Sequence, residues 1–379
     1  MYNKIDRKIF EKIKALDYGK NEKLNIILHS NHYEATKKYL NQNHSDYIEL
    51  PFVSCFALKA QVKDLFSLAG QDCTRYISSD TKVTSLIYES KKFMSVDNLY
   101  SKIDSVSKHS CVVIDTGVYS HIDFLLGKNR IVEFVDLINN KMSPYDDNGH
   151  GTFVCGILSG SGIVGKYEGI DNTCDIIVIK ALDNDGETTS TKILQSMQWI
   201  LENKEKYNIK VVCMSFGSVF GGIDDPLMRG VEVLWDNGIC VVCAAGNNGP
   251  NEETIMSPGT SKKVITVGSL DNIKKEELAV ADFSSRGPVG NFYKPDMVVP
   301  GVDIISTSVF KDTKKFYTKM SGTSVSAPMV AGVASLLYNI YSNYSPDQIK
   351  YKLISMCVPF NFDKNSEGFG WLNLRNLLL

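Results

Sequence analysis

Three short segments constrain this chain more than any other feature, because each joins a predicted secondary-structure element to one chemically active side chain. In chain order they are 111–117 (CVVIDTG), 148–152 (NGHGT) and 321–328 (SGTSVSAP), with Asp115, His150 and Ser324 as active residues. A serine hydroxyl is a weak nucleophile at neutral pH, so it needs a base and a carboxylate that orients the base. Asp, His, Ser is one of three unrelated chain orders that build such a triad. The segments therefore predict nucleophilic catalysis.

The local pattern around Asp115 and His150 suits these roles. Residues 110–115 are typical of a buried parallel strand that ends in a carboxylate, and ligands gather at the carboxyl ends of strands in open α/β sheets. His150 lies between two glycines, ahead of an apolar run with helical spacing, which predicts a place in the first helical turn. Taken alone, the aspartate fits a solvated loop equally well, and a lone histidine is more often structural than catalytic. Their joint occurrence favours catalysis.

The surroundings of Ser324 provide for the negative charge that its reaction would develop. An apolar helical run follows it, so the N–H groups and dipole of a helix start would lie beside its hydroxyl. The strand predicted at 241–244 leads into a turn that carries Asn247, and an amide beside the nucleophile can donate to an oxyanion. Alone, an N-cap serine or an Asn-Gly turn needs no chemistry. Because Ser326 replaces the second glycine of a Gly-x-Ser-x-Gly elbow, the motif counts against a lipase or esterase.

Taken together, these segments resemble the three signatures of the subtilisin-like serine peptidases (subtilases), which are Asp-Thr-Gly, His-Gly-Thr and Gly-Thr-Ser-x-Ser-Ala-Pro. The resemblance covers residues 105–379 and extends through 179–183 (IKALD), 214–217 (MSFG), 283–288 (FSSRGP) and 294–301 (KPDMVVPG). It implies that Asp115 orients His150, that His150 is the general base and then the acid, and that Ser324 is the acylated nucleophile. It also implies that Asn247 shares the oxyanion hole with the Ser324 N–H.

The same resemblance implies a substrate-binding surface, made of an edge segment and the turn that would wall the first specificity pocket. Its residues are Ser215, Phe216 and Gly217 in the edge segment and Ala245, Gly246, Asn248 and Met256 at the turn. The edge segment would pair with the substrate backbone by β-augmentation. Asn248 and Met256 carry no charge and Met256 is bulky, so we expect uncharged, small or medium side chains before the cut.

One loop departs from the family in a way that bears on cofactors. The loop after the histidine helix often binds calcium through an Asn-rich stretch, but here residues 159–165 read SGSGIVG and offer neither a carboxylate nor an amide. Calcium prefers six to eight oxygen ligands. In addition, Phe153 stands where the family has a second histidine. We therefore expect no required cofactor and no metal ligand among the site residues, with calcium possible elsewhere in the chain.

The residues ahead of these motifs are predicted to form a separate small unit. Within 21–86 the strand and helix patterns follow the order βαββαβ, typical of a small α+β ferredoxin-like unit. By pattern and position it resembles the subtilase propeptide, an intramolecular chaperone and inhibitor, and an unrelated N-terminal domain is the alternative. Residues 1–20 are predicted as an extension with a short docking or surface helix. Residues 78–101 are polar without clear periodicity, so we expect an extended segment with one self-processing cut within 80–96.

From residue 87 onward strands and helices alternate, which predicts a catalytic domain over 87–379. The alternation predicts an α/β fold with a mostly parallel sheet and helices on both faces. The predicted strands include 176–182, 211–215, 239–244 and 264–267, and the predicted helices include 192–203, 226–237 and 324–341.

The composition excludes some partners and indicates a compartment. The 379 residues carry 41 basic against 43 acidic side chains, so nothing favours binding to nucleic acid or to a membrane surface. No apolar run reaches the ~20 residues of a membrane span, and the N-terminus lacks the apolar core of a signal peptide. The cysteines number 9, which is odd, and several lie in apolar runs, which favours reduced thiols and a cytoplasmic location.

The leading hypothesis is a serine endopeptidase made as a self-inhibited zymogen, with a peptide or protein substrate and its own N-terminal propeptide as partners. The alternative is a catalytically silent subtilase-fold scaffold for binding, against which the intact Asp115, His150, Ser324 and Asn247 argue. The physiological substrate is left open by the sequence.

Overall fold

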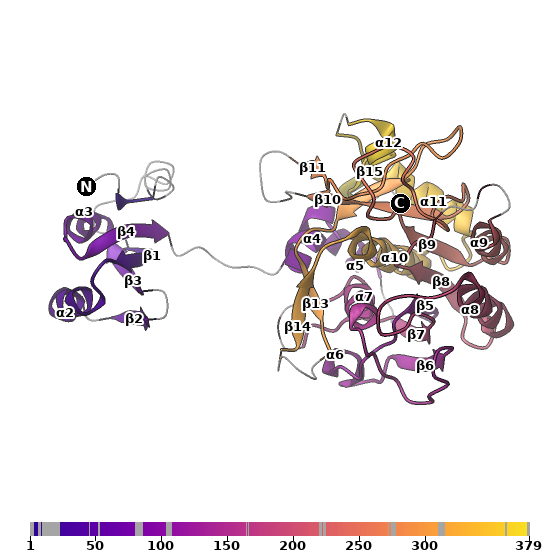
Figure 1. Ribbon diagram of the computed structural model, residues 1–379, viewed down its shortest axis with the longest axis horizontal. Coiled ribbons are helices and arrows are strands. Elements are labelled where there is room, and N and C mark those ends of the chain that lie inside the picture. Colours follow the sequence, from indigo (N-terminus) through magenta and orange to yellow (C-terminus); the bar gives the residue numbers. More distant parts are fainter. Residues whose placement is uncertain are drawn as a thin grey trace. The chain divides into compact units, whose positions relative to one another are not determined.

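The computed structural model divides the chain into two compact units, Met1–Val83 and Thr84–Leu379 (Figure 1). Each unit has its own hydrophobic core. The structure describes residues 4–6, 9, 23–44, 46–51, 54–79, 86–103, 108–163, 165, 167–219, 222, 225–271, 273, 278–309, 315–360 and 362–376.

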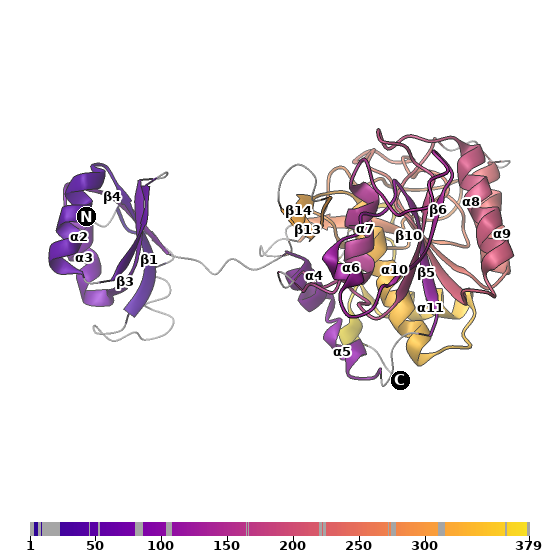
Figure 2. The same cartoon turned by 90° about the horizontal axis from the view of Figure 1, so that it is seen from below.

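The small unit is a 4-stranded antiparallel sheet with the helices α2 and α3 on one face (Figure 2). Its elements are β1 (Lys23–Ser30), α2 (Tyr33–Asn43), β2 (Tyr47–Leu50), β3 (Cys55–Gln61), α3 (Leu65–Ala69) and β4 (Thr74–Ser79). The strands lie in the order β2-β3-β1-β4. Ile26 and Leu28 of β1 share a face because alternate strand residues point the same way, and they pack with Phe56 and Leu68 in the core. The predicted order βαββαβ and the ferredoxin-like arrangement are confirmed.

The first residues of the chain belong to this small unit. Ile5 forms a β-bridge with Ile77 of β4, and both Ile5 and Ile9 are buried in the small unit's core. The short docking or surface helix predicted from the N-terminal apolar spacing is therefore wrong at Ile5, which lies in a β-bridge, whereas Ile9 is helical and buried, as expected of a docking helix. Residues 7–8 and 10–22, on which the rest of that prediction falls, lie outside the described residues.

The large unit is built on one sheet of mainly parallel strands. Its strands are β5 (Ser110–Asp115), β6 (Ile131–Asp136), β7 (Asp175–Lys180), β8 (Ile209–Met214), β9 (Cys240–Ala244), β10 (Ile265–Asp271), β11 (Ala279–Val280), β12 (Met297–Pro300), β15 (Cys357–Val358) and β16 (Trp371–Leu372). They follow the order β6-β7-β5-β8-β9-β10-β12-β16-β15, and the pairs from β6 to β16 are parallel. β5 lies between β7 and β8, and all its residues are buried. This interior strand carries Asp115 to the carboxyl edge of the sheet.

Helices cover both faces of this sheet, as predicted (Figure 2). α7 (His150–Ser159) and α10 (Thr323–Ile340) pack together on one face, and α8 (Ser190–Asn203) and α9 (Pro226–Asp236) lie on the other. The remaining elements include α6 (Ile122–Leu125), the hairpin of β13 (Ile304–Thr307) and β14 (Tyr317–Met320), α11 (Pro346–Ser355) and α12 (Lys364–Glu367). By length and composition α10 could cross a membrane, but 83% of it is buried inside the unit, as in the core helix of a folded domain.

The segment after the boundary differs from the sequence prediction. α4 (Leu86–Met94) and α5 (Asp97–Tyr100) are helical, so the extended conformation predicted for 78–101 is wrong over these residues. The side chains of Met94, Val96 and Leu99 are buried in the large unit's core. These short helices gain their stability from docking rather than from their own sequence, which is why local periodicity does not reveal them. Residues 80–85 lie outside the described part of the chain.

Candidate active site

Asp115 and His150 meet because of where their elements begin and end. Asp115 closes β5 with a fully buried side chain, and His150 opens α7 directly after Gly149, whose backbone is left-handed. The Asp115 Oδ1 lies 2.8 Å from the His150 Nδ1, within hydrogen-bond distance. The same oxygen accepts from the backbone N–H of Thr116 at 2.7 Å. In this geometry a carboxylate fixes the imidazole and leaves its Nε2 to act as the base.

Ser324 and Asn247 come from the elements next to this pair. Ser324 is in the first turn of α10, and Asn247 follows β9. A Cβ built at Gly322 would lie 3.0 Å from the Ser324 Oγ and 3.4 Å from the Asn247 Nδ2, so both groups border the same small space. The Asn247 Oδ1 accepts from the backbone N–H and the hydroxyl of Thr323, both at 3.0 Å. This arrangement leaves the Nδ2 as the group that can donate to an oxyanion.

One cleft of about 480 Å³ brings these side chains together at the carboxyl ends of β5, β7, β8 and β9. Its described lining comprises Thr116, Asn148, His150, Leu182, Asp185, Gly186, Ser215, Phe216, Gly217, Ala244, Gly246, Asn247, Asn248, Met256, Thr323 and Ser324. Every predicted substrate-binding residue is in this set except Ala245. Ala245 is fully buried, and its carbonyl accepts from the backbone N–H of Met256 at 2.9 Å, so it supports the wall from behind.

Met256 packs between two glycines of the cleft wall. A Cβ built at Gly217 would lie 2.6 Å from the Met256 Cβ, and one built at Gly246 would lie 2.6 Å from the Met256 Cγ. A side chain at either glycine would therefore collide with Met256. The thioether fills the space between the edge segment 215–217 and the turn after β9, which is where the resemblance locates the first specificity pocket.

Charges and burial in the site shift the pKa of His150. Burial disfavours the imidazolium of His150, but the charge and hydrogen bond of Asp115 together with the charge of Asp146 outweigh burial. The pKa of His150 is therefore raised above its ordinary value of 6.5. A raised pKa makes His150 a stronger base toward a hydroxyl proton, and it confines that role to the pH range in which the ring is neutral.

Sequence reasoning misses two polar residues that hold the site. Asp146 is buried and accepts hydrogen bonds from Thr116 and Thr152, on either side of the acid–base pair. Lys180, fully buried at the end of β7, donates to the Thr116 carbonyl at 2.6 Å and to Asp147 at 2.7 Å. In the sequence Asp146 lies in a polar loop and Lys180 in an apolar strand. Only their burial in the folded chain distinguishes them from ordinary charged residues of the surface. The one available signal is that Asp146 lies two residues before the histidine motif 148–152.

The loop at which the resemblance implies calcium is held by a basic side chain. The buried guanidinium of Arg130 donates to the Ser159 hydroxyl at 2.6 Å, to the Asn172 carbonyl at 2.8 Å and to the Ser159 carbonyl. These oxygens are occupied, and Arg130 would repel a second cation. The residues of this loop therefore do not fit calcium. Within the described residues, no group of three or more His, Cys, Asp or Glu side chains could hold a metal ion.

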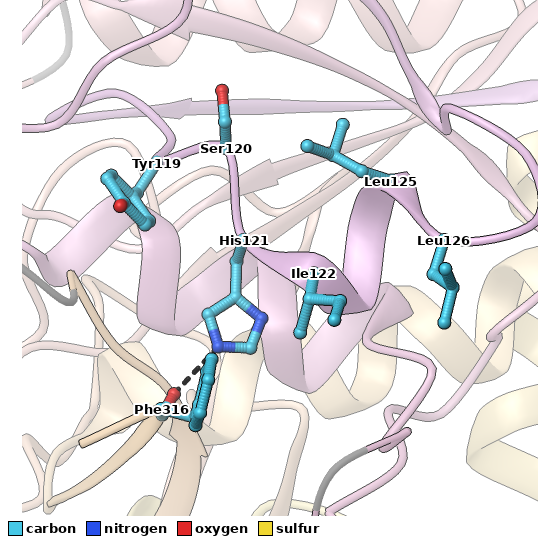
Figure 3. A pocket seen from close by; sticks show the side chains of 7 residues that line it. All are labelled: Tyr119, Ser120, His121, Ile122, Leu125, Leu126 and Phe316. Atoms are coloured by element: carbon cyan, nitrogen blue, oxygen red, sulfur yellow. Dashed lines mark hydrogen bonds between the residues drawn. The ribbon is translucent and has the colours of Figure 1, made fainter. Parts of the chain in front are cut away.

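A second hollow shares no described lining residue with the cleft (Figure 3). It measures about 330 Å³ and is lined by Tyr119, Ser120, His121, Ile122, Leu125, Leu126 and Phe316. The His121 Nε2 lies 2.9 Å from the Phe316 carbonyl oxygen, and its Nδ1 accepts from the Asp123 backbone N–H at 3.1 Å. The Nδ1 thus caps the start of α6, and the Nε2 connects α6 to the residue before β14. These two contacts explain why the histidine is buried, without any role in chemistry.

Known proteins resemble this chain in sequence and in fold. Serine protease AprX of Bacillus subtilis (strain 168) is 39% identical over 288 residues, which are 70% of this chain and 64% of AprX. The chain thus spans less than two thirds of AprX. Subtilisin DY of Bacillus licheniformis is 31% identical over 265 residues, 69% of this chain and 88% of that protein. Among solved structures, a cold adapted subtilisin-like serine proteinase matches at a TM-score of 0.58 and 27% identity, covering 70% of this chain and 88% of its own.

The model of the Subtilase family matches residues 108–371, which contain β5, α7, α10 and the whole cleft. The likeness in sequence, the parallel sheet and the order of the site-bearing elements agree. The chain therefore belongs to the subtilase family.

Proposed function

We propose that this chain is a serine endopeptidase that hydrolyses peptide bonds of peptide or protein substrates through an acyl-enzyme. The observation that carries the proposal is the Asp115–His150 hydrogen bond at a cleft where the Ser324 Oγ and the Asn247 amide border one small space. The names of its relatives, serine protease AprX and subtilisin DY, support it. In this proposal every reacting group except water and substrate comes from the chain, and no cofactor is required.

In the proposed reaction the Ser324 Oγ attacks the substrate carbonyl carbon while the His150 Nε2 takes the hydroxyl proton. The carbonyl oxygen becomes an oxyanion, to which the Asn247 amide and the Ser324 N–H donate. His150 then gives its proton to the leaving amine as the C–N bond breaks, and the acyl group stays on Ser324. Water attacks this ester with His150 again as base, which releases the acid and restores the hydroxyl. Asp115 stays ionised and stabilises the imidazolium.

The triad prediction concerns Ser324→Ala, His150→Ala and the double variant. Each single change should reduce peptide hydrolysis to the residual level set by binding and the oxyanion hole, and the double change should add little, because the triad acts as a unit. Steady-state hydrolysis of a peptide measures this, with the exposed Ser342→Ala as control. A double variant that lost far more than either single variant would contradict a shared mechanism.

Covalent labelling separates the enzyme from the alternative of a silent binding scaffold. A fluorophosphonate should label the wild-type protein at Ser324 and leave Ser324→Ala unlabelled, as mass spectrometry of the digested protein would report. Wild-type protein that stays unlabelled while it still binds peptides would favour the scaffold.

The oxyanion prediction concerns Asn247→Ala and Asn247→Asp. Asp keeps the oxygen that accepts from Thr323 but loses the Nδ2 donor, so both variants should lower kcat with little change in KM. The expected loss is about 10²–10³ in kcat, the range known for the oxyanion-hole asparagine of a subtilisin. Stopped-time assays over a range of substrate concentrations separate kcat from KM. A change confined to KM would mean that Asn247 binds substrate in the ground state.

We propose that Met256 limits the residue before the cut to uncharged, small or medium side chains. The support is its position between Gly217 and Gly246, where it fills the pocket space. Met256→Gly should therefore raise kcat/KM for Phe and Tyr before the cut relative to Ala, and a peptide library with that position varied measures the change. A strong preference of the wild-type protein for Lys, Arg or Asp there would reject the proposal.

We propose that the small unit is a propeptide that inhibits the large unit until the chain cuts itself. The support is family membership, a βαββαβ unit with its own core ahead of the catalytic unit, and the docking of α4 in the large unit. Because a bond inside a docked helix is a poor substrate, the cut should fall before Leu86, at the start of the expected window.

Mass spectrometry of purified protein tests this maturation. The wild-type chain should be cut once between residues 80 and 86, and Ser324→Ala should remain at full length. The separated small unit should inhibit the mature enzyme when added back. An active enzyme that stays at full length, or a Ser324→Ala chain cut at the same bond without added protease, would show that the small unit is not a self-processed propeptide.

A further inference from the structure

Asp146 lies at the junction of the two segments that carry the acid and the base of the triad. Its side chain is only 1% exposed. Its Oδ1 accepts from the Thr116 hydroxyl at 3.0 Å and from the backbone N–H groups of Asn148 and Gly149 at 3.1 and 2.8 Å. Its Oδ2 accepts from the backbone N–H and the hydroxyl of Thr152 at 2.8 and 2.6 Å. One buried carboxylate therefore gathers donors from both segments.

We propose that Asp146 is a positioning residue that holds His150 in register with Asp115. The inference rests on the proposed function, because it assigns a role within that reaction. Thr116 directly follows Asp115, and Thr152 lies in the first turn of α7 behind His150. By binding both threonines, the Asp146 carboxylate fixes the chain next to the acid against the helix start that carries the base.

The backbone at this junction leaves little room for an alternative arrangement. The Thr116 Oγ1, which donates to Asp146, also accepts from the backbone N–H of Gly151 at 2.9 Å. A Cβ built at Gly151 would collide with the Gly117 carbonyl oxygen, and one built at Gly117 would collide with the Tyr145 carbonyl oxygen. The two segments touch backbone to backbone, so a shift of the carboxylate is passed directly to the helix start.

Asp146 also acts on the base through its charge. Burial lowers the pKa of His150, but the charge and hydrogen bond of Asp115 and the charge of Asp146 together outweigh burial and raise it. Neutralising Asp146 should therefore lower the pKa of His150, and the pH profile reports this electrostatic effect separately from the kcat loss that displacement of the ring would cause. The other charged side chains described around this end of the cleft are Lys180, Asp147 and Asp185.

Asp146→Asn tests the inference, because asparagine keeps the size but loses the charge and turns an amide donor toward N–H groups. For a neutral peptide we expect kcat to fall about ten- to hundredfold with KM nearly unchanged, as a displaced catalytic group would cause. We also expect the acid limb of the kcat/KM profile to move to lower pH, since the neutral form of His150 then persists further into acid. NMR titration of the low-field Nδ1 proton of His150 should show the same decrease in the pKa of this ring, in the absence of turnover.

Asp136→Asn is the matched control. Asp136 is also buried, and it accepts from the backbone N–H groups of residues 138, 139 and 141 and from the Tyr145 hydroxyl. Its loss should lower the melting temperature and leave the pH profile in place. At the other end of the junction, Thr116→Val, which loses the hydroxyl, should reproduce the kcat loss of Asp146→Asn, and Thr116→Ser, which keeps the hydroxyl, should lose less than Thr116→Val.

The outcomes separate the inference from the proposed function. An Asp146→Asn enzyme with a lower melting temperature but wild-type kcat and an unshifted acid limb would overturn the positioning role. If Asp146→Asn does not fold, Thr116→Val decides, and full activity of that variant would count against the inference. A wild-type protein that neither cleaves peptides nor reacts with a fluorophosphonate would instead refute the proposed function.

Discussion

A carboxylate buried completely at the end of the interior strand β5 is the constraint around which this site is organised. Removing a charge from water is costly unless it is paired and hydrogen-bonded, so Asp115 is tolerable only while Thr116 and His150 face it. β5 cannot slide to relieve this cost, because β7 and β8 hold it in register on both sides. The strand pairing of β5 thus fixes the position of Asp115, and the start of α7 places His150 against it.

The junction of close backbone contacts explains why the base arrives at one place. Gly117 and Gly151 let the turn after β5 touch the start of α7, and Thr116 connects the two through its hydroxyl. A second buried carboxylate beside the first is electrostatically unfavourable by itself, and only the many donors around Asp146 make it tolerable. The hydrogen bonds of Asp146 therefore stabilise the fold and hold the proposed catalytic pair at the same time. The pKa of His150 is the quantity that separates these two contributions.

Local patterns account for the part of the fold and site that the sequence predicts. Each site residue lies in a short segment whose own pattern predicts its structure. These segments are the apolar run that ends in Asp115, the glycines around His150 before an apolar helix, and the helix start at Ser324. The α/β sheet and the βαββαβ unit follow from the same periodicities. What the sequence does not reveal depends on packing between distant segments. Ala245 faces the core rather than the cleft, and no periodicity distinguishes these orientations.

Because α4 and α5 pack on the large unit, this unit begins at its N-terminal end with these helices. The family match starts at residue 108, whereas the compact unit starts at Thr84. Between them Lys91 donates to Glu168 at 2.9 Å and to the Gly169 carbonyl at 3.1 Å, across the loop that Arg130 also holds. A recombinant protein trimmed to the matched residues would leave an uncovered apolar surface and a loop with one of its two cationic supports missing. The shortest self-sufficient form of this unit is therefore longer at its N-terminal end than the stretch by which its relatives are recognised.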